Sequence, residues 1–263
     1  MISEIPLLII AFLFGAIVGS FLNVVILRLP EENQSIVFPA SHCPQCSSPL
    51  SWFENIPILS YIFLRGKCGH CNKSISLQYP LVELLMAIVT VALVHRFQVS
   101  LVTVGYFFFS AALLVIIFID IRLQIIPDTI SLPGIVLGFL FSLVSDTVTW
   151  QSSLIGLLAG GGVLYAVALT YALLRKIDGM GGGDIKLLAM IGAWLGWQAL
   201  PFVIFMSSAT GAIIGIIAMR RQNKGGQTRI PFGPFLSLAA LLYIFFSESI
   251  LYYYTLYLNG QWP

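Results

Sequence analysis

The chain has 263 residues, of which 58% are hydrophobic and only 9% are charged, and its formal net charge is +2. Soluble domains carry about 25% charged residues, so this composition excludes an ordinary soluble domain and predicts a chain surrounded by the lipid bilayer. The positive charge is too small and too dispersed for nucleic-acid binding, which we exclude.

An uncharged run at residues 5–27 predicts the first transmembrane helix, which we assign to residues 1–27. No positively charged segment precedes this run and no small-residue cleavage site follows it, so we interpret it as a retained helix rather than a removed signal peptide. Residues 28–79 are polar and predict a small soluble insert. Residues 80–263 are expected to form the rest of the transmembrane core.

The other spans are predicted from further apolar runs. In chain order these are 79–94, 97–119, 129–145, 147–174 and the region from 230 onward. The uncharged run 187–219 is too long for one perpendicular span. The turn signal at residues 196–198 and Pro201 divide it into two spans. The sixth span is then short, at about 18 Å, and the seventh has a normal length. The sequence therefore predicts an all-α polytopic membrane protein with about eight transmembrane helices. Seven spans with a re-entrant segment at 185–200 is the alternative.

The orientation follows from Lys and Arg, which concentrate on the cytosolic side of membrane proteins. With eight spans, only Arg96 among the 13 Lys and Arg residues falls on the other side. The sequence therefore places the soluble insert, the loop at 120–128, the glycine-rich loop before Asp184 and the loop at 220–229 in the cytosol.

The insert contains two C-x2-C pairs separated by 21 residues. Each pair bends the chain so that two thiolates face one ion, and two pairs complete a tetrahedral site. Disulfides are rare in the cytosol, so we predict a structural Zn²⁺ site in a zinc-ribbon-like insert. Two redox dithiols are an alternative, as is a site in which His42 or His70 replaces one Cys. The predicted ligands are Cys43, Cys46, Cys68 and Cys71.

Four acidic residues lie at predicted cytosolic helix ends, namely Asp120, Asp128, Asp178 and Asp184. Asp128 follows a proline and is a good N-cap for the fourth span. Asp178 precedes Gly179 in a helix-ending turn and is expected to be solvated. Asp184 fits an N-cap of the sixth span as well as a catalytic group.

No cap explains Asp120, because it lies at the C-terminal end of the third span, where the helix dipole disfavours negative charge. A carboxyl group in that position suits a pair in which two acids share one proton. Asp184 follows Gly181, Gly182 and Gly183, which let a substrate strand or a second carboxylate approach closely. We predict that Asp120 and Asp184 carry out aspartyl-type peptide hydrolysis at a membrane surface.

Two polar residues fall inside predicted spans. Glu83 lies near the cytosolic face, where it either helps to bind a cationic group or pairs with Lys73 or Arg28. Asn23 is expected to make an interhelical hydrogen bond.

Two other classes of protein fit part of the pattern. A transporter also places acids in a helix bundle, but nearer the middle of the membrane and often with repeat symmetry, which the sequence does not show. A membrane assembly factor with a zinc ribbon and no catalysis is the third class.

Several short motifs occur together in the chain. They are Gly19-Ser20-Phe21-Leu22-Asn23, Arg28-Leu29-Pro30, the two C-x2-C pairs, Gly66-Lys67, Tyr79-Pro80-Leu81-Val82-Glu83, Ile119-Asp120, Ile126-Pro127-Asp128, Gly181-Gly182-Gly183-Asp184-Ile185-Lys186-Leu187 and Pro231-Phe232-Gly233-Pro234. With these motifs, nearly the whole chain resembles the bacterial type IV prepilin peptidases. These are bifunctional leader peptidase/N-methyltransferases of pilus and type II secretion systems, and they are GxGD-type intramembrane aspartyl proteases.

The resemblance implies an aspartic endopeptidase in the bacterial inner membrane that cuts the basic leader of prepilins or pseudopilins after a Gly, at the cytosolic face. The family's catalytic residues map onto Asp120 and Asp184. Many members then methylate the new N-terminus with S-adenosylmethionine, and the position linked to methyl transfer maps onto Gly66, beside Lys67. The resemblance associates the insert at 28–79 with this second activity. The motifs also supply the supporting residues Gly181, Gly182, Gly183, Asp128, Lys186 and Glu83.

Overall fold

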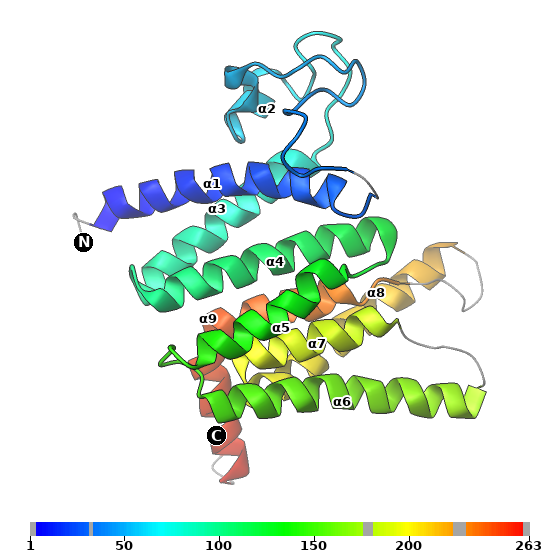
Figure 1. Cartoon of the computed structure of the whole chain (residues 1–263). Helices are drawn as coiled ribbons and strands as arrows, with labels where there is room; N and C mark the ends of the chain where they lie inside the picture. The colour runs from blue at the N-terminus through cyan, green and yellow to red at the C-terminus, as the bar shows by residue number, and fades with distance from the viewer. Residues whose placement is uncertain (1–3, 32–33, 176–180, 223–229, 260–263) are drawn as a thin grey trace. The chain divides into compact units, whose positions relative to one another are not determined.

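The computed structural model describes residues 4–31, 34–175, 181–222 and 230–259 (Figure 1). Within these ranges the chain is helical and forms no β-strand. It divides into two compact units, Met1–Val115 and Ile116–Pro263. The first unit contains α1 (Glu4–Arg28), η1 (Trp52–Asn55), α2 (Leu59–Phe63), α3 (Gln78–Phe97) and most of α4 (Leu101–Leu123). The second contains the end of α4, α5 (Asp128–Ser142), α6 (Trp150–Arg175), α7 (Gly182–Leu195), η2 (Trp197–Ala199), α8 (Leu200–Gln222) and α9 (Gly233–Leu258).

In the first unit, α1 packs closely against α3 because small residues of α1 face the α3 backbone. A methyl group added at Gly15 would lie 2.8 Å from Cα of Ala87, and one added at Gly19 would lie 2.6 Å from Cα of Glu83. This spacing of four residues is typical of tightly packed membrane helices. One turn further along α1, the side-chain amide of Asn23 donates to the carbonyl oxygen of Tyr79 at 3.0 Å. The predicted interhelical hydrogen bond is thereby confirmed.

In the second unit, α7 packs against both α5 and α6 (Figure 1). Every residue of α7 from Leu187 to Leu195 is buried. On the α6 side the two backbones meet at Gly156 and Gly192, because a methyl group on either glycine would overlap the other's carbonyl oxygen. The hydroxyl of Ser153 also donates to the carbonyl oxygen of Ala193 at 2.7 Å. Helix α7 is therefore held by backbone-to-backbone contact along α6.

One aromatic side chain of α7 interlocks with α5. The indole N–H of Trp194 donates to the carbonyl oxygen of Gly134 at 2.8 Å, and its ring stacks on Phe141 with centroids 5.1 Å apart. Gly138 leaves the space that the indole fills, since a methyl group there would lie 2.5 Å from Cδ1 of Trp194. Helix α5 is thus fixed along the face of α7 by an interlocking aromatic contact.

The predicted all-helical membrane architecture is confirmed. Six helices of the described residues are long and apolar enough to cross a bilayer, namely α1, α3, α4, α6, α9 and the stretch Trp197–Met219 around α8. Helices α5 and α7 fill the two remaining predicted regions with 15 and 14 residues. A helix of 14 residues is about 21 Å long, which is less than the hydrocarbon thickness of about 30 Å. The count of eight crossings therefore stays a prediction.

The predicted turn between the sixth and seventh regions is present. Helix α7 ends at Leu195, and Gly196 follows with φ of 78°, a backbone conformation that favours glycine. The expectations for Asp178 and Gly179, and for most of the loop at 220–229, fall outside the described residues.

We expect Gly192→Ala to destabilise the protein by about 1–3 kcal/mol, because the added methyl group overlaps the α6 backbone, which cannot move aside as a side chain can. The matched control is Gly162→Ala on α6, where an added methyl group meets no atom within 4 Å in the part of the chain that the structure describes. Thermal unfolding of the purified proteins in detergent measures the stability of both variants. Equal melting temperatures for the two variants would contradict the close helix packing.

Candidate active site and cysteine cluster

Asp120 lies in the last turn of α4 and is buried. Its Oδ2 accepts a hydrogen bond from the backbone N–H of Gly233 at 2.9 Å. Gly233 is the first residue of α9, so the carboxylate lies at the positive end of that helix's dipole. The sequence indicated only the unfavourable C-terminal end of α4. The structure adds a second contribution, because the N-terminus of α9 favours negative charge on the same buried carboxyl group.

A glycine is required at position 233 for this contact. A methyl group there would lie 2.6 Å from Oδ2 of Asp120, which is closer than a carbon and an oxygen approach without displacement. The following residue, Pro234, lacks an N–H and is tolerated in the first turn of a helix. The motif Pro231-Phe232-Gly233-Pro234 therefore starts α9 and presents a backbone donor to Asp120. The sequence shows this motif but not its partner.

Asp184 is the third residue of α7 and is half-buried. The N-cap of α7 is Gly181, so the alternative in which Asp184 caps this helix is wrong. Burial and then the negative charge of Asp120 raise the pKa of Asp184 to about 7. The two carboxyl groups, which are remote in sequence, are therefore close enough to interact electrostatically. Such a pair holds one proton near neutral pH and can supply both an acid and a base.

The glycines before Asp184 differ in their surroundings. Among the described residues, methyl groups added at Gly181 or Gly182 would meet no atom within 4 Å, whereas one added at Gly183 would lie 2.9 Å from Cβ of Ile126. Gly181 and Gly182 thus leave open space beside the start of α7, as a substrate strand would require. Gly183 instead makes a packing contact with the loop at 120–128.

Asp128 does not cap α5. The N-cap of α5 is Pro127, and no side chain makes a capping hydrogen bond there. The carboxylate of Asp128 instead accepts two hydrogen bonds from Nζ of Lys186, both at 2.7 Å. This ion pair joins the start of α5 to the first turns of α7. The capping role expected from the sequence is therefore wrong, because a partner 58 residues away takes the carboxylate.

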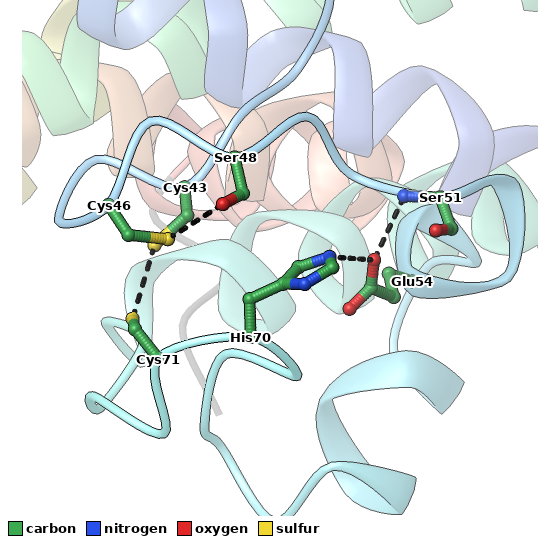
Figure 2. A network of polar contacts seen from close by, with 7 residues as sticks. All are labelled: Cys43, Cys46, Ser48, Ser51, Glu54, His70 and Cys71. Atoms are coloured by element: carbon green, nitrogen blue, oxygen red, sulfur yellow. Dashed lines mark hydrogen bonds and ion pairs between the residues drawn. The ribbon is translucent and has the colours of Figure 1, made fainter.

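The four cysteines of the insert converge. Their Sγ atoms all lie within 4.8 Å of one another. Figure 2 shows three of them, Cys43, Cys46 and Cys71, and the Sγ atoms of Cys43 and Cys71 are 3.9 Å apart. Four sulfurs bound to one Zn²⁺ at about 2.3 Å in a tetrahedron lie about 3.8 Å apart. The donor set and its spacing therefore fit one tetrahedral metal ion.

The two cysteine pairs fold into matching turns. In the first, the N–H of Cys43 donates to the carbonyl oxygen of Ser48, and the N–H of Ser47 donates back to Cys43. The same return bond, from Asn72 to Cys68, closes the second turn, and Ser47 and Asn72 both have positive φ, at 57° and 56°. The sequence shows the repeated cysteine spacing but not the repeated backbone turn that accompanies it.

Neither histidine beside the cysteines belongs to the cluster of sulfur atoms. Nδ1 of His42 lies 3.1 Å from the carbonyl oxygen of Ala40. Nε2 of His70 lies 3.9 Å from Oε2 of Glu54, which also accepts the N–H of Ser51 at 2.9 Å (Figure 2). Glu54 therefore joins the turn η1 to the second cysteine pair and supports the cluster from outside.

Glu83 is buried, and its Oε2 accepts the backbone N–H of Ile58 at 2.7 Å. The alternative pairings with Lys73 and Arg28 are wrong. The Lys73 ammonium contacts the Gln45 side chain, and the Arg28 guanidinium donates to a backbone carbonyl. Glu83 thus anchors the chain just before α2 onto α3.

Gly66 and Lys67 lie directly after α2. Gly66 has φ of 69°, and a methyl group there would lie 2.9 Å from the ring of Tyr61. The backbone of Lys67 pairs with Ser74 in an isolated β-bridge. Glycine at position 66 therefore satisfies a tight turn against an aromatic ring, next to the second cysteine pair.

The fold and these sites define an all-helical polytopic membrane protein with two interacting carboxyl groups at helix ends and a four-cysteine cluster. The type IV leader peptidase family model matches residues 107–216, and the bacterial peptidase A24 N-terminal domain model matches residues 13–97. The chain belongs to the type IV leader peptidase family.

Named relatives are similar over nearly the whole chain. A prepilin leader peptidase/N-methyltransferase of Aeromonas salmonicida (strain A449) is 38% identical, and the alignment covers 93% of this chain and 92% of the relative. Proteins of the same name from Neisseria gonorrhoeae and Pseudomonas putida are 38% and 35% identical, over 92% of this chain and 91% of each relative. No solved structure matches the chain significantly.

We expect Cys43→Ser to lower the bound zinc measured by atomic absorption, because it removes one of the four sulfur donors. His42→Ala is the matched control: it changes a neighbouring side chain that lies outside the cluster and should leave the zinc content unchanged. Full zinc content in the Cys43 variant, or loss of zinc in the His42 variant, would contradict the four-cysteine ligand set.

Proposed function

We propose that the chain cleaves the basic leader of prepilins or pseudopilins after a Gly residue, at the cytosolic face of the bacterial inner membrane. The observation that carries this proposal is the electrostatic interaction between Asp120 and Asp184 at the ends of two helices. Membership of the type IV leader peptidase family supports it, as do the names of the relatives. The concentration of Lys and Arg supports the cytosolic orientation.

The surroundings of the two carboxyl groups suggest different roles. The N–H of Gly233 and the N-terminus of α9 stabilise negative charge on Asp120, so Asp120 acts as the general base that takes a proton from the attacking water. Asp184, with a pKa raised to about 7, is protonated in a large fraction of molecules near neutral pH, and in that form it polarises the scissile carbonyl. As the bond breaks, a proton is returned to the leaving amine.

Hydrolysis requires an extended substrate, because a helix hides its peptide bonds. The open side of Gly181 and Gly182 provides room for such a strand beside Asp184. The apolar stem of the substrate stays in the lipid bilayer, and its basic leader remains in the cytosol. The ion pair between Asp128 and Lys186 holds α5 and α7 together next to this space.

We further propose that the chain methylates the new N-terminal amine and that the insert at 28–79 takes part. S-adenosylmethionine supplies the methyl group when it is bound. Gly66 and Lys67 lie in the turn between α2 and the second cysteine pair, where a structural Zn²⁺ held by Cys43, Cys46, Cys68 and Cys71 would fix the backbone. Zinc then has a folding role, and the membrane core at 80–263 carries the peptidase.

We expect Asp120→Asn and Asp184→Asn each to abolish cleavage, because neither variant retains both an acid and a base. Asp128→Asn is the comparison variant: it weakens the ion pair with Lys186 but leaves both acids of the pair in place, so it should lower cleavage less than either Asp120→Asn or Asp184→Asn does. A gel that separates full-length from shortened prepilin measures cleavage by purified protein, with membrane levels compared in parallel. Normal processing by either of the first two variants would refute the assignment.

Methyl transfer is tested by adding S-adenosylmethionine labelled on the methyl group to a cleavage reaction. We expect label on the shortened product from the wild-type protein, and we expect Gly66→Ala to lower the label at least about tenfold while cleavage continues. Alanine at position 66 strains this turn, because φ is positive there and because the added methyl group would contact the ring of Tyr61. Unlabelled product from the wild-type protein would contradict the proposed methyl transfer, and the proposed function would then be that of a peptidase alone.

A further inference from the structure

The side chain of Ile126 lies where three segments of the second unit meet. A methyl group added at Gly183 would lie 2.9 Å from Cβ of Ile126, and one added at Gly233 would lie 3.1 Å from its Cδ1. Gly183 directly precedes Asp184, and Gly233 donates its N–H to Asp120. Ile126 therefore packs against the backbone on both sides of the carboxyl pair.

Each of these contacts is made against a glycine, so the isoleucine side chain itself fills the space between the starts of α7 and α9. No side chain at position 183 or 233 can rearrange to replace it. If the Ile126 side chain were shortened, the gap would have to be closed by movement of one helix start toward the other or be left as a cavity.

Ile126 is well suited to act as a rigid spacer. Its branched Cβ restricts χ1, so the side chain does not adapt readily to a change in its surroundings. Pro127 follows it and restricts the backbone of Ile126 to extended conformations. The loop from Asp120 to Asp128 therefore presents a stiff apolar group of fixed length at this point.

We propose that Ile126 is a positioning residue that sets the separation between the carboxyl groups of Asp120 and Asp184. It supports Asp184 through Gly183 and Asp120 through Gly233, so it acts through the backbone beside each carboxyl group. This inference rests on the proposed peptidase function, in which both carboxyl groups act on one water molecule. A shift of about 1 Å in such an arrangement can lower the rate about a hundredfold.

The first experiment compares Ile126→Ala with Ile125→Ala in the purified full-length protein. Both changes remove the same atoms from adjacent isoleucines, but Ile125 is exposed. We expect Ile126→Ala to lower kcat for prepilin cleavage at least about tenfold with KM changed less than about twofold, because the reacting groups move while the substrate-binding surface remains. Ile126→Val, which lacks only Cδ1, should fall between Ile126→Ala and the wild type. Ile125→Ala should keep kcat within about twofold.

A second experiment tests the contact by complementation. Gly183→Ala adds a methyl group against Ile126 and should lower kcat. Combining it with Ile126→Gly removes Cβ of residue 126, the atom nearest to the new methyl group, together with the rest of the isoleucine side chain. The double variant should therefore be more active than Gly183→Ala alone, which independent damage at two sites would not produce.

The outcomes separate this inference from the proposed function. If the wild-type protein cleaves prepilin and Ile126→Ala matches Ile125→Ala in kcat, the spacer role is wrong although the peptidase function stands. A double variant no more active than Gly183→Ala alone would also overturn the spacer role. If Asp120→Asn still cleaves, the proposed function itself fails. Thermal unfolding of each variant in detergent identifies a variant that has lost its fold, and kcat is then compared among the Val, double and wild-type proteins.

Discussion

The second unit depends on the meeting of two glycines, Gly156 of α6 and Gly192 of α7. Because neither has a side chain, the helix backbones touch, and the apolar surface of α7 is buried along its whole length from residue 187 onward. A buried helix with one fixed face has little freedom to rotate or slide. Its first turn, which carries Asp184, is therefore held at a defined place relative to the segments packed around it.

Helix ends provide the electrostatic surroundings of both acidic residues. Asp120 receives a backbone N–H from the start of α9, and Asp184 belongs to the first turn of α7. Helix N-termini stabilise negative charge without needing a cationic side chain. The cationic side chain of Lys186, two positions after Asp184, is engaged by Asp128. Asp120 thus receives a backbone donor, whereas burial and the charge of Asp120 favour the protonated form of Asp184.

The sequence predicts those features that depend on local composition. Uncharged runs predict the eight helical regions, the turn signal predicts the end of α7 at Gly196, and the cysteine spacing predicts the cluster of four sulfur atoms. Contacts between distant segments could not be derived in this way. The N–H donor to Asp120 comes from a residue 113 positions away, and the partner of Asp128 comes from 58 positions away. No periodic pattern records which loop ends meet, so Asp128 was assigned to capping and Ile126 was overlooked.

The contact of Gly15 and Gly19 with α3, like that of Gly156 with α7, has a consequence for motion. Where backbone touches backbone, no side-chain rotamer can absorb a displacement, so each pair of helices moves as one rigid body. Any opening that admits an extended polypeptide must then come from segments outside these pairs.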